Sequence, residues 1–229
     1  EKKDMENDGL QERFRKVGKK HGYETVNAEF VSFKEFKVRW QRSYKWADFK
    51  VSDYMADAPP EVIEGLASTL FARICGKGDP DFSEEMCKWV TAPDFSRYKQ
   101  PTYLRRSRNL SRSRQGQHRD LGECYRRLID AGLAQDDPGL FLSWTKEPNV
   151  RKVGYCSVLM KVVAISSALD SPEVPEFVAD YVMYHELCHI MIGFDPSSEK
   201  HGIEFAELES KYPRQKEAED WLRRLCMYL

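Results

Sequence analysis

Apolar residues recur along the first hundred residues with two different periods. Between residues 36 and 51 they alternate with polar residues in three short runs, 36–40, 44–46 and 49–51, the first of which ends at Trp40; this period of two predicts extended strands. From residue 60 to 76 the spacing becomes helical, after two prolines that fit the first turn of a helix and before glycines that end it. Shorter helices are predicted over residues 10–20 and 83–90.

A similar order of elements returns after residue 120. A helical face predicts a helix from Leu121 to about Gly132, a strand follows at 140–144, and residues 153–166 are long enough for a β-hairpin. A long, mostly apolar helix is predicted from about residue 175 to 192, where glycine ends it. Two shorter helices are predicted on either side of a proline at position 213 and complete the chain.

A basic stretch separates these two regions. Residues 97–119 contain eight lysines and arginines, interleaved with serines and with no acidic residue, which predicts a loop or linker. We therefore expect an α+β region at 1–100, a basic linker at 101–119 and a second domain at 120–229. Segment 105–119 fits three roles: a contact with the phosphates of DNA or RNA, a solvated connector, or a cover that controls access to a functional site.

Charge, hydropathy and cysteine content argue against several classes of protein, among them membrane-spanning and secreted proteins. The formal net charge is −1, so overall charge gives no reason to expect a strongly charged partner. No apolar run reaches the roughly 18 residues of a membrane-spanning helix, and the charged first residues do not form a secretory signal. Six cysteines without a CxxC pair indicate reduced, mostly buried thiols, and hence a cytoplasmic protein without membrane contact.

The segment HELCH, residues 185–189, carries the most specific chemistry. Its histidines, His185 and His189, are four residues apart and therefore share one helix face, where both imidazoles reach a zinc ion at about 2.0–2.1 Å. Glu186 projects beside the metal and can take a proton from an activated water. The alternative is a structural helix with two hydrogen-bonded histidines, but polar groups without partners are costly in so apolar a helix.

Catalytic zinc normally has three protein ligands, so a third is expected on the following helix. That helix offers His201, Glu204, Glu207 and Glu209. We favour His201 because it shares the apolar, inward face of the helix with Phe205. Glu204 is the fallback, whereas Glu207 and Glu209 are expected to point away.

The shared order of elements suggests an internal duplication. Three matches define the alignment: Trp40 with Trp144, Val51-Ser52 with Ile165-Ser166, and Pro60-Glu61 with Pro175-Glu176. In that alignment Leu70, Phe71 and Ile74 stand opposite His185, Glu186 and His189. The first region is then a degenerate copy without metal ligands.

Residues 120–229 resemble the SprT-like zinc metallopeptidases, the group that includes Spartan-type proteases and minigluzincins. The matching segments are LFLSW at 140–144, Gly154-Tyr155, VAISSAL at 163–169, HELCH, and HGIEF at 201–205. The resemblance implies a zincin-like α+β fold, with helices packed on a short β-ribbon and zinc held by His185, His189 and His201. It also implies that an extended peptide adds as a strand to a ribbon edge, expected at 162–166.

We therefore expect a zinc-dependent endopeptidase of the HExxH type that acts on protein or peptide substrates, with Glu186 as general base and Zn²⁺ as cofactor. One alternative is a zinc-binding protein without proteolytic activity. The other is a nucleic-acid-associated protein whose function depends on the basic linker. Glu186 favours the enzyme, because a structural zinc site has no need of it.

Overall fold

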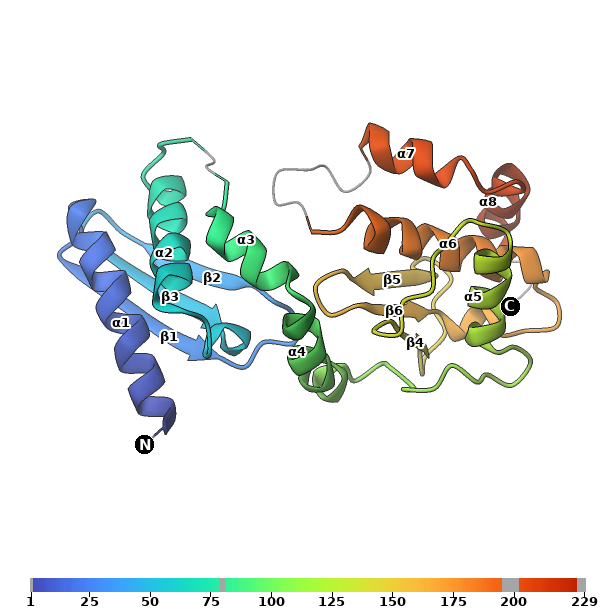
Figure 1. Cartoon of the computed structure of the whole chain (residues 1–229), viewed down its shortest axis with the longest axis horizontal. Helices are drawn as coiled ribbons and strands as arrows, with labels where there is room; N and C mark the ends of the chain where they lie inside the picture. The colour runs from blue at the N-terminus through green and yellow to red at the C-terminus, as the bar shows by residue number, and fades with distance from the viewer. Residues whose placement is uncertain (1, 79–80, 195–201, 226–229) are drawn as a thin grey trace. The chain divides into compact units, whose positions relative to one another are not determined.

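The computed structural model describes residues 2–78, 81–194 and 202–225 of the chain. It divides into two compact units, Glu1–Phe95 and Ser96–Leu229. Both units combine helices with one three-stranded sheet, so the architecture is mixed α+β (Figure 1). No helix of the described residues combines the length and the apolar character that a membrane span requires.

The N-terminal unit packs two long helices on one face of its sheet (Figure 1). Its elements are α1 (Lys2–Lys20), β1 (Thr25–Val31), β2 (Val38–Arg42), β3 (Trp46–Ser52), η1 (Asp53–Met55), α2 (Pro60–Ile74) and α3 (Glu84–Thr91). The central strand β3 runs parallel to β1 and antiparallel to β2. Alternate residues of β3 are buried, and among them Phe49 packs on Phe14 of α1 and Phe71 of α2. The expected helices and the 36–51 ribbon are present, and β1 is an addition.

The C-terminal unit is built around α6. After α4 (Pro93–Arg106), which begins just before the division, its elements are α5 (Leu121–Asp130), β4 (Phe141–Trp144), β5 (Gly154–Ser157), β6 (Val162–Ile165), η2 (Ser167–Leu169), α6 (Glu176–Ile192), α7 (Ile203–Glu209) and α8 (Gln215–Arg223). The central strand β6 is buried at all four positions; it pairs with β4 on one side and β5 on the other, and α6 packs against it. The expectation that residues 162–166 form a sheet edge is therefore wrong.

Helix α6 carries the HELCH segment, and its ends follow the sequence. The carbonyl of Pro175 accepts the N–H of Val178 at 3.0 Å in the first turn, and Gly193 ends the helix at a φ of 84°, which suits glycine. Arg127 of α5 forms a two-pronged ion pair with the buried Asp180, at 2.7 and 2.8 Å. That pair fixes α6 against α5 one turn before the histidines.

The basic stretch is more ordered than a linker. Residues up to Arg106 belong to α4, so the expected loop at 97–106 is wrong. The following residues pair with the outer edge of β4: Trp144 donates its N–H to Ser113 at 3.0 Å and accepts one from Ser111 at 2.9 Å. Asp170 then accepts the backbone N–H groups of residues 117, 118 and 119. A strand edge and a carboxylate therefore hold this segment on the C-terminal unit.

The two sheets share one topology and one register. In the N-terminal sheet Phe30 and Val38 stand on either side of Val51. In the C-terminal sheet Trp144 and Gly154 stand on either side of Ile165. The next residue, Ser52 or Ser166, donates its N–H to the residue before the antiparallel edge strand, Lys37 or Val153, at 3.0 and 2.8 Å. The sequence alignment of Val51-Ser52 with Ile165-Ser166 agrees with this register. Trp144, however, corresponds to Phe30 and not to Trp40.

The positions at which α2 and α6 begin also change how these two helices align. Their alignment shifts by one residue from the one that the sequence suggested. Pro59 and Pro175 are the N-caps of α2 and α6. Counted from these caps, His185, Glu186 and His189 correspond to Thr69, Leu70 and Arg73, and not to Leu70, Phe71 and Ile74. The sequence alignment was off because it matched Pro60, the first helical residue of α2, with the cap of α6.

Candidate functional site

His185 and His189 lie side by side on α6. Their ring centroids are 5.3 Å apart, with planes inclined at 81°. Phe205 of α7 packs against both rings, at 5.0 Å from His185 and 4.4 Å from His189. The helical spacing thus brings two imidazoles together, and α7 holds them from the other side.

Glu186 lies beneath the sheet rather than in solvent. Only 6% of the residue is exposed, and it faces β5, where a Cβ on Gly154 would stand 2.7 Å from Glu186 Oε1. Burial raises the pKa of the Glu186 carboxyl, against the opposing effects of His185, a hydrogen bond from the Cys156 thiol, and Lys152. Glycine at position 154 is therefore required for the carboxylate to approach the strand this closely.

A hollow of about 640 Å³ lies over this carboxylate. Gly154 and Lys152 line it from β5 and the preceding loop, and His185 and Glu186 line it from α6. Glu209 lines it from α7, and Glu219, Leu222 and Arg223 line it from α8. A volume of this size accommodates a segment of peptide rather than a single small ion.

Glu209 contacts the site, contrary to the expectation that it would point away. Its Oε1 lies 2.5 Å from His185 Nδ1 and accepts the Tyr181 hydroxyl at 2.8 Å. The same hydroxyl is 3.2 Å from Glu219 of α8. The expectation for Glu209 was wrong because the side of α7 that faces α6 is set by the docking of the two helices, which helical spacing within α7 does not reveal. Glu207 is exposed, as expected.

The expected third ligand, His201, lies outside the described residues. Glu204, the fallback, is exposed. In residues 2–78, 81–194 and 202–225, no group of three or more His, Cys, Asp or Glu side chains is placed so that it could hold a metal ion. The described part of the site therefore consists of two imidazoles, with one carboxylate at the strand and a second at His185.

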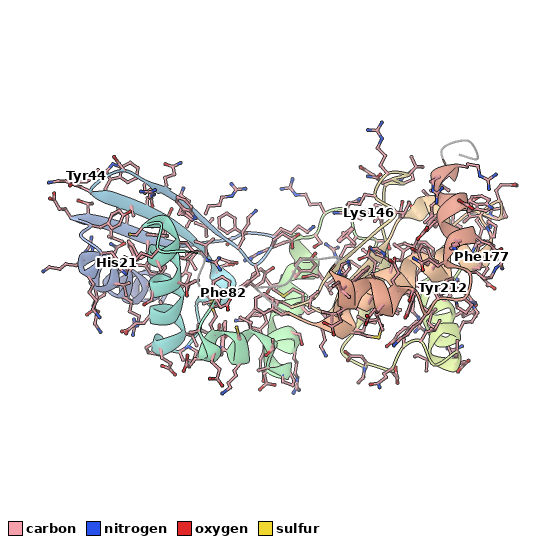
Figure 2. All side chains as sticks on the ribbon, turned by 90° about the horizontal axis from the view of Figure 1, so that it is seen from above. His21, Tyr44, Phe82, Lys146, Phe177 and Tyr212 are labelled. Atoms are coloured by element: carbon pink, nitrogen blue, oxygen red, sulfur yellow. The ribbon has the colours of Figure 1, made fainter. Side chains whose placement is uncertain are left out.

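Two tyrosines near the site, Tyr184 and Tyr212, donate their hydroxyls to backbone carbonyls. Tyr184 donates to the carbonyl of Leu208 at 2.6 Å, and Tyr212 donates to the carbonyl of Phe177 at 2.8 Å (Figure 2 labels both residues of this second pair). These bonds fasten α6 to the segment that follows it. Cys188 of the HELCH segment is fully buried and belongs to the hydrophobic core.

The edge strand beside Glu186 is β5, which packs on α6 (Figure 1). Because Ser166 donates its N–H to Val153, antiparallel geometry directs the backbone groups of Val153 and Tyr155 toward β6. The N–H and C=O groups of Gly154 and Cys156 then point away from the sheet. In the described part of the chain no strand pairs with this edge, whereas residues 109–113 cover the edge of β4.

Comparison of the chain with protein-family models, with curated proteins and with solved structures finds no match. The site must therefore be interpreted from its own residues.

Proposed function

We propose that the C-terminal unit is a zinc-dependent endopeptidase with a zincin-like site. The observation that carries this proposal is the position of Glu186: a buried carboxylate directly beside the paired imidazoles, under the edge strand β5, which among the strands of the described residues pairs only with β6. A structural pair of histidines would not require a carboxylate in that place.

The donor set fits zinc. His185 and His189 would supply two ligands, and His201 is the proposed third. The carboxylate of Glu209 at His185 Nδ1 leaves Nε2 of the same ring for the metal, as expected for a histidine ligand with a carboxylate partner. Zinc, when bound, supplies an acidified water and polarises a carbonyl oxygen.

The protein's own groups would perform the remaining steps. Outward N–H and C=O groups of Gly154 and Cys156 would pair with an extended peptide and align its backbone along β5. Glu186 would accept a proton from the attacking water and return it to the leaving amine. Since Gly154 lies directly over Glu186, one strand both positions the peptide and brings it to the base.

The N-terminal unit is proposed to be a non-catalytic copy of the same fold. Shared strand order and register support this duplication. In the N-terminal unit the position of Gly154 is held by Val38, and the position of Glu186 by Leu70. Both replacements are apolar, so the features that serve the proposed chemistry are confined to the C-terminal unit.

Substitution of Glu186→Gln tests this function directly. The variant keeps the shape of the side chain but removes the base, so we expect zinc binding to persist and cleavage of unfolded casein to fall by at least about a hundredfold. A chelator should abolish cleavage by the unaltered protein. Zinc bound without any cleavage by the unaltered protein would instead support the alternative of a proteolytically silent zinc protein.

Nucleic-acid contact through residues 105–119 remains a prediction with less support. Arg112 and Arg119 direct their guanidinium groups to backbone carbonyls, and Arg114 lies 3.7 Å from Asp120. These arginines therefore stabilise the fold of the segment. A salt-dependent affinity for DNA, lost when Arg105 and Arg108 are both replaced by glutamine, would restore this candidate.

A further inference from the structure

The N-terminal unit protects one edge of its sheet and leaves the other open. At β1, side-chain amides of α1 occupy the backbone groups: Gln11 bonds to the carbonyl of Val26 at 2.5 Å and to the N–H of Ala28 at 2.7 Å. Asn7 accepts the N–H of Phe30 at 2.8 Å. At the opposite edge, β2 pairs with β3 and with no other strand of the described residues.

The register identifies which groups of β2 point outward. Ser52 donates its N–H to the carbonyl of Lys37 at 3.0 Å, and Ser43 donates its N–H to the carbonyl of Trp46 at 2.9 Å. Both bonds place the hydrogen-bonded pairs of the β2–β3 ladder at the odd-numbered residues from 37 to 43. Hydrogen-bonded pairs alternate with outward-facing pairs in an antiparallel ladder. The backbone N–H and C=O groups of Val38, Trp40 and Arg42 are therefore directed away from the sheet.

Side chains along this edge are cationic and aromatic. Between Phe36 and Ala47 the chain has four lysines and arginines and no acidic residue. Trp40, Trp46 and Tyr44 are 48%, 42% and 88% exposed, which is unusual for such large rings. Figure 2 shows Tyr44 at the tip of the hairpin.

An open edge of this kind normally invites aggregation, and charge is a common protection against it. Here the protection is incomplete, because exposed tryptophan and tyrosine accompany the cations. A hollow of about 470 Å³ also lies beside this edge, over β2 and β3, and is lined by Val38, Arg39, Trp40, Gln41, Asp48 and Lys50. This side of the sheet therefore combines outward backbone groups of β2, a net positive charge, and a hollow over β2 and β3 that can take side chains.

We propose that the outer edge of β2 binds an extended, acidic peptide segment by strand addition. The backbone groups at positions 38, 40 and 42 would form the ladder, and Arg39, Arg42 and their neighbours would attract the carboxylates. β2 holds the same place in its sheet as β5 holds in the C-terminal sheet. The inference does not require hydrolysis by the C-terminal unit.

Single-stranded nucleic acid fits this edge less well. Trp40 is paired with Phe49 and lies on the helix-covered side of the sheet, whereas Trp46 alternates with the buried Ala47 and lies on the other side. Two rings on opposite faces cannot stack successive bases along one track. A strand at the edge, in contrast, has side chains on both faces and can contact both rings.

Fluorescence anisotropy with the full-length protein in EDTA tests the proposal apart from any cleavage. The probe is a labelled decapeptide in which glutamate alternates with valine and threonine; the controls are the same peptide with lysine for glutamate, and a ten-nucleotide oligo(dT). We expect the acidic peptide to bind most tightly. Stronger binding of oligo(dT) or of the lysine peptide would overturn the proposal.

The decisive variant is Val38→Pro, matched with Val38→Ala. Proline is tolerated at the first residue of an edge strand but removes the outward N–H, so affinity should fall about fivefold to tenfold, and less than threefold for alanine. Equal affinities of the two variants would refute strand addition. If Val38→Pro does not fold, Arg42→Gln decides: it should weaken binding and reduce its salt dependence, and unchanged binding overturns the proposal.

Discussion

His185 Nδ1 and Glu209 Oε1 lie 2.5 Å apart, across 24 residues of sequence and between two helices. This contact orients one imidazole of the HELCH pair and selects the tautomer with its hydrogen on Nδ1, because a carboxylate accepts a hydrogen bond and cannot donate one. Tyr181 donates to the same carboxylate and so fixes its position. The ligand pair that sequence spacing predicts is thus oriented by a residue that the spacing does not reveal.

We predict that Glu209→Gln weakens zinc binding by about tenfold, since loss of such a carboxylate partner typically costs ten- to a hundredfold in metal affinity. Zinc affinity is measured by competition with a chromogenic chelator. Glu207→Gln is the matched control, because Glu207 is exposed on the same helix. Equal zinc affinity of the two variants would show that Glu209 has no role in orienting His185.

Gly154→Ala should impair catalysis without releasing zinc. The added Cβ would stand 2.7 Å from Glu186 Oε1 and 2.9 Å from Val182 Cγ1, so either the carboxylate or the strand must move. A displacement of this size commonly lowers the rate by about a hundredfold. The assay is casein cleavage at equal zinc content, with Ser157→Ala on the same strand as the control. Full activity of Gly154→Ala would contradict the proposed alignment of base and strand.

Arg127→Met should destabilise the C-terminal unit by about 2 kcal/mol. The variant leaves Asp180 buried without its two-pronged partner, and the expected cost is below that of a fully buried pair because Arg127 is 36% exposed. Urea unfolding measures the change in the free energy of unfolding. Arg126→Met, an exposed position on the same helix, should change that free energy by less than about 0.5 kcal/mol. Similar losses for both variants would argue against the ion pair as the cause.

Asp137 should make stability depend on acid pH. Partial burial opposes its ionisation, but the hydrogen bond from Lys161 and the N–H of Gly139 prevail and hold the pKa of Asp137 below its usual value. A carboxyl whose folded-state pKa is lowered contributes stability above its unfolded pKa of about 3.9, and loses that contribution as pH falls through the folded value.

Asp137→Asn is therefore expected to be less stable than the unaltered protein at pH 6 and to approach it at pH 3. Urea midpoints at the two pH values test this, and Asp136→Asn, at an exposed neighbour, should show little difference at either. The proposed linkage would be excluded if the difference in urea midpoint between Asp137→Asn and the unaltered protein were the same at pH 6 and pH 3.

Local patterns in the sequence predicted much of the secondary structure. Helices α2, α5 and α6 begin and end close to their proline, aspartate and glycine signals, because caps act over a few residues. The basic stretch at 97–106 is helical despite its composition: Tyr103 is buried, and Gln100 bonds to three carbonyls of the C-terminal unit. Those partners are about forty to sixty residues away, so no local pattern indicates them.

The pairing of His185 with His189, and the place of Glu186 between them, could be predicted from residue spacing alone, since that spacing fixes which residues share a helix face. Only the tertiary structure placed β6 in the centre and β5 at the edge, brought Gly154 against Glu186, and turned Glu209 toward His185. The physical reason is that strand order and helix docking depend on contacts between distant residues. Such contacts do not produce a periodic pattern in the sequence.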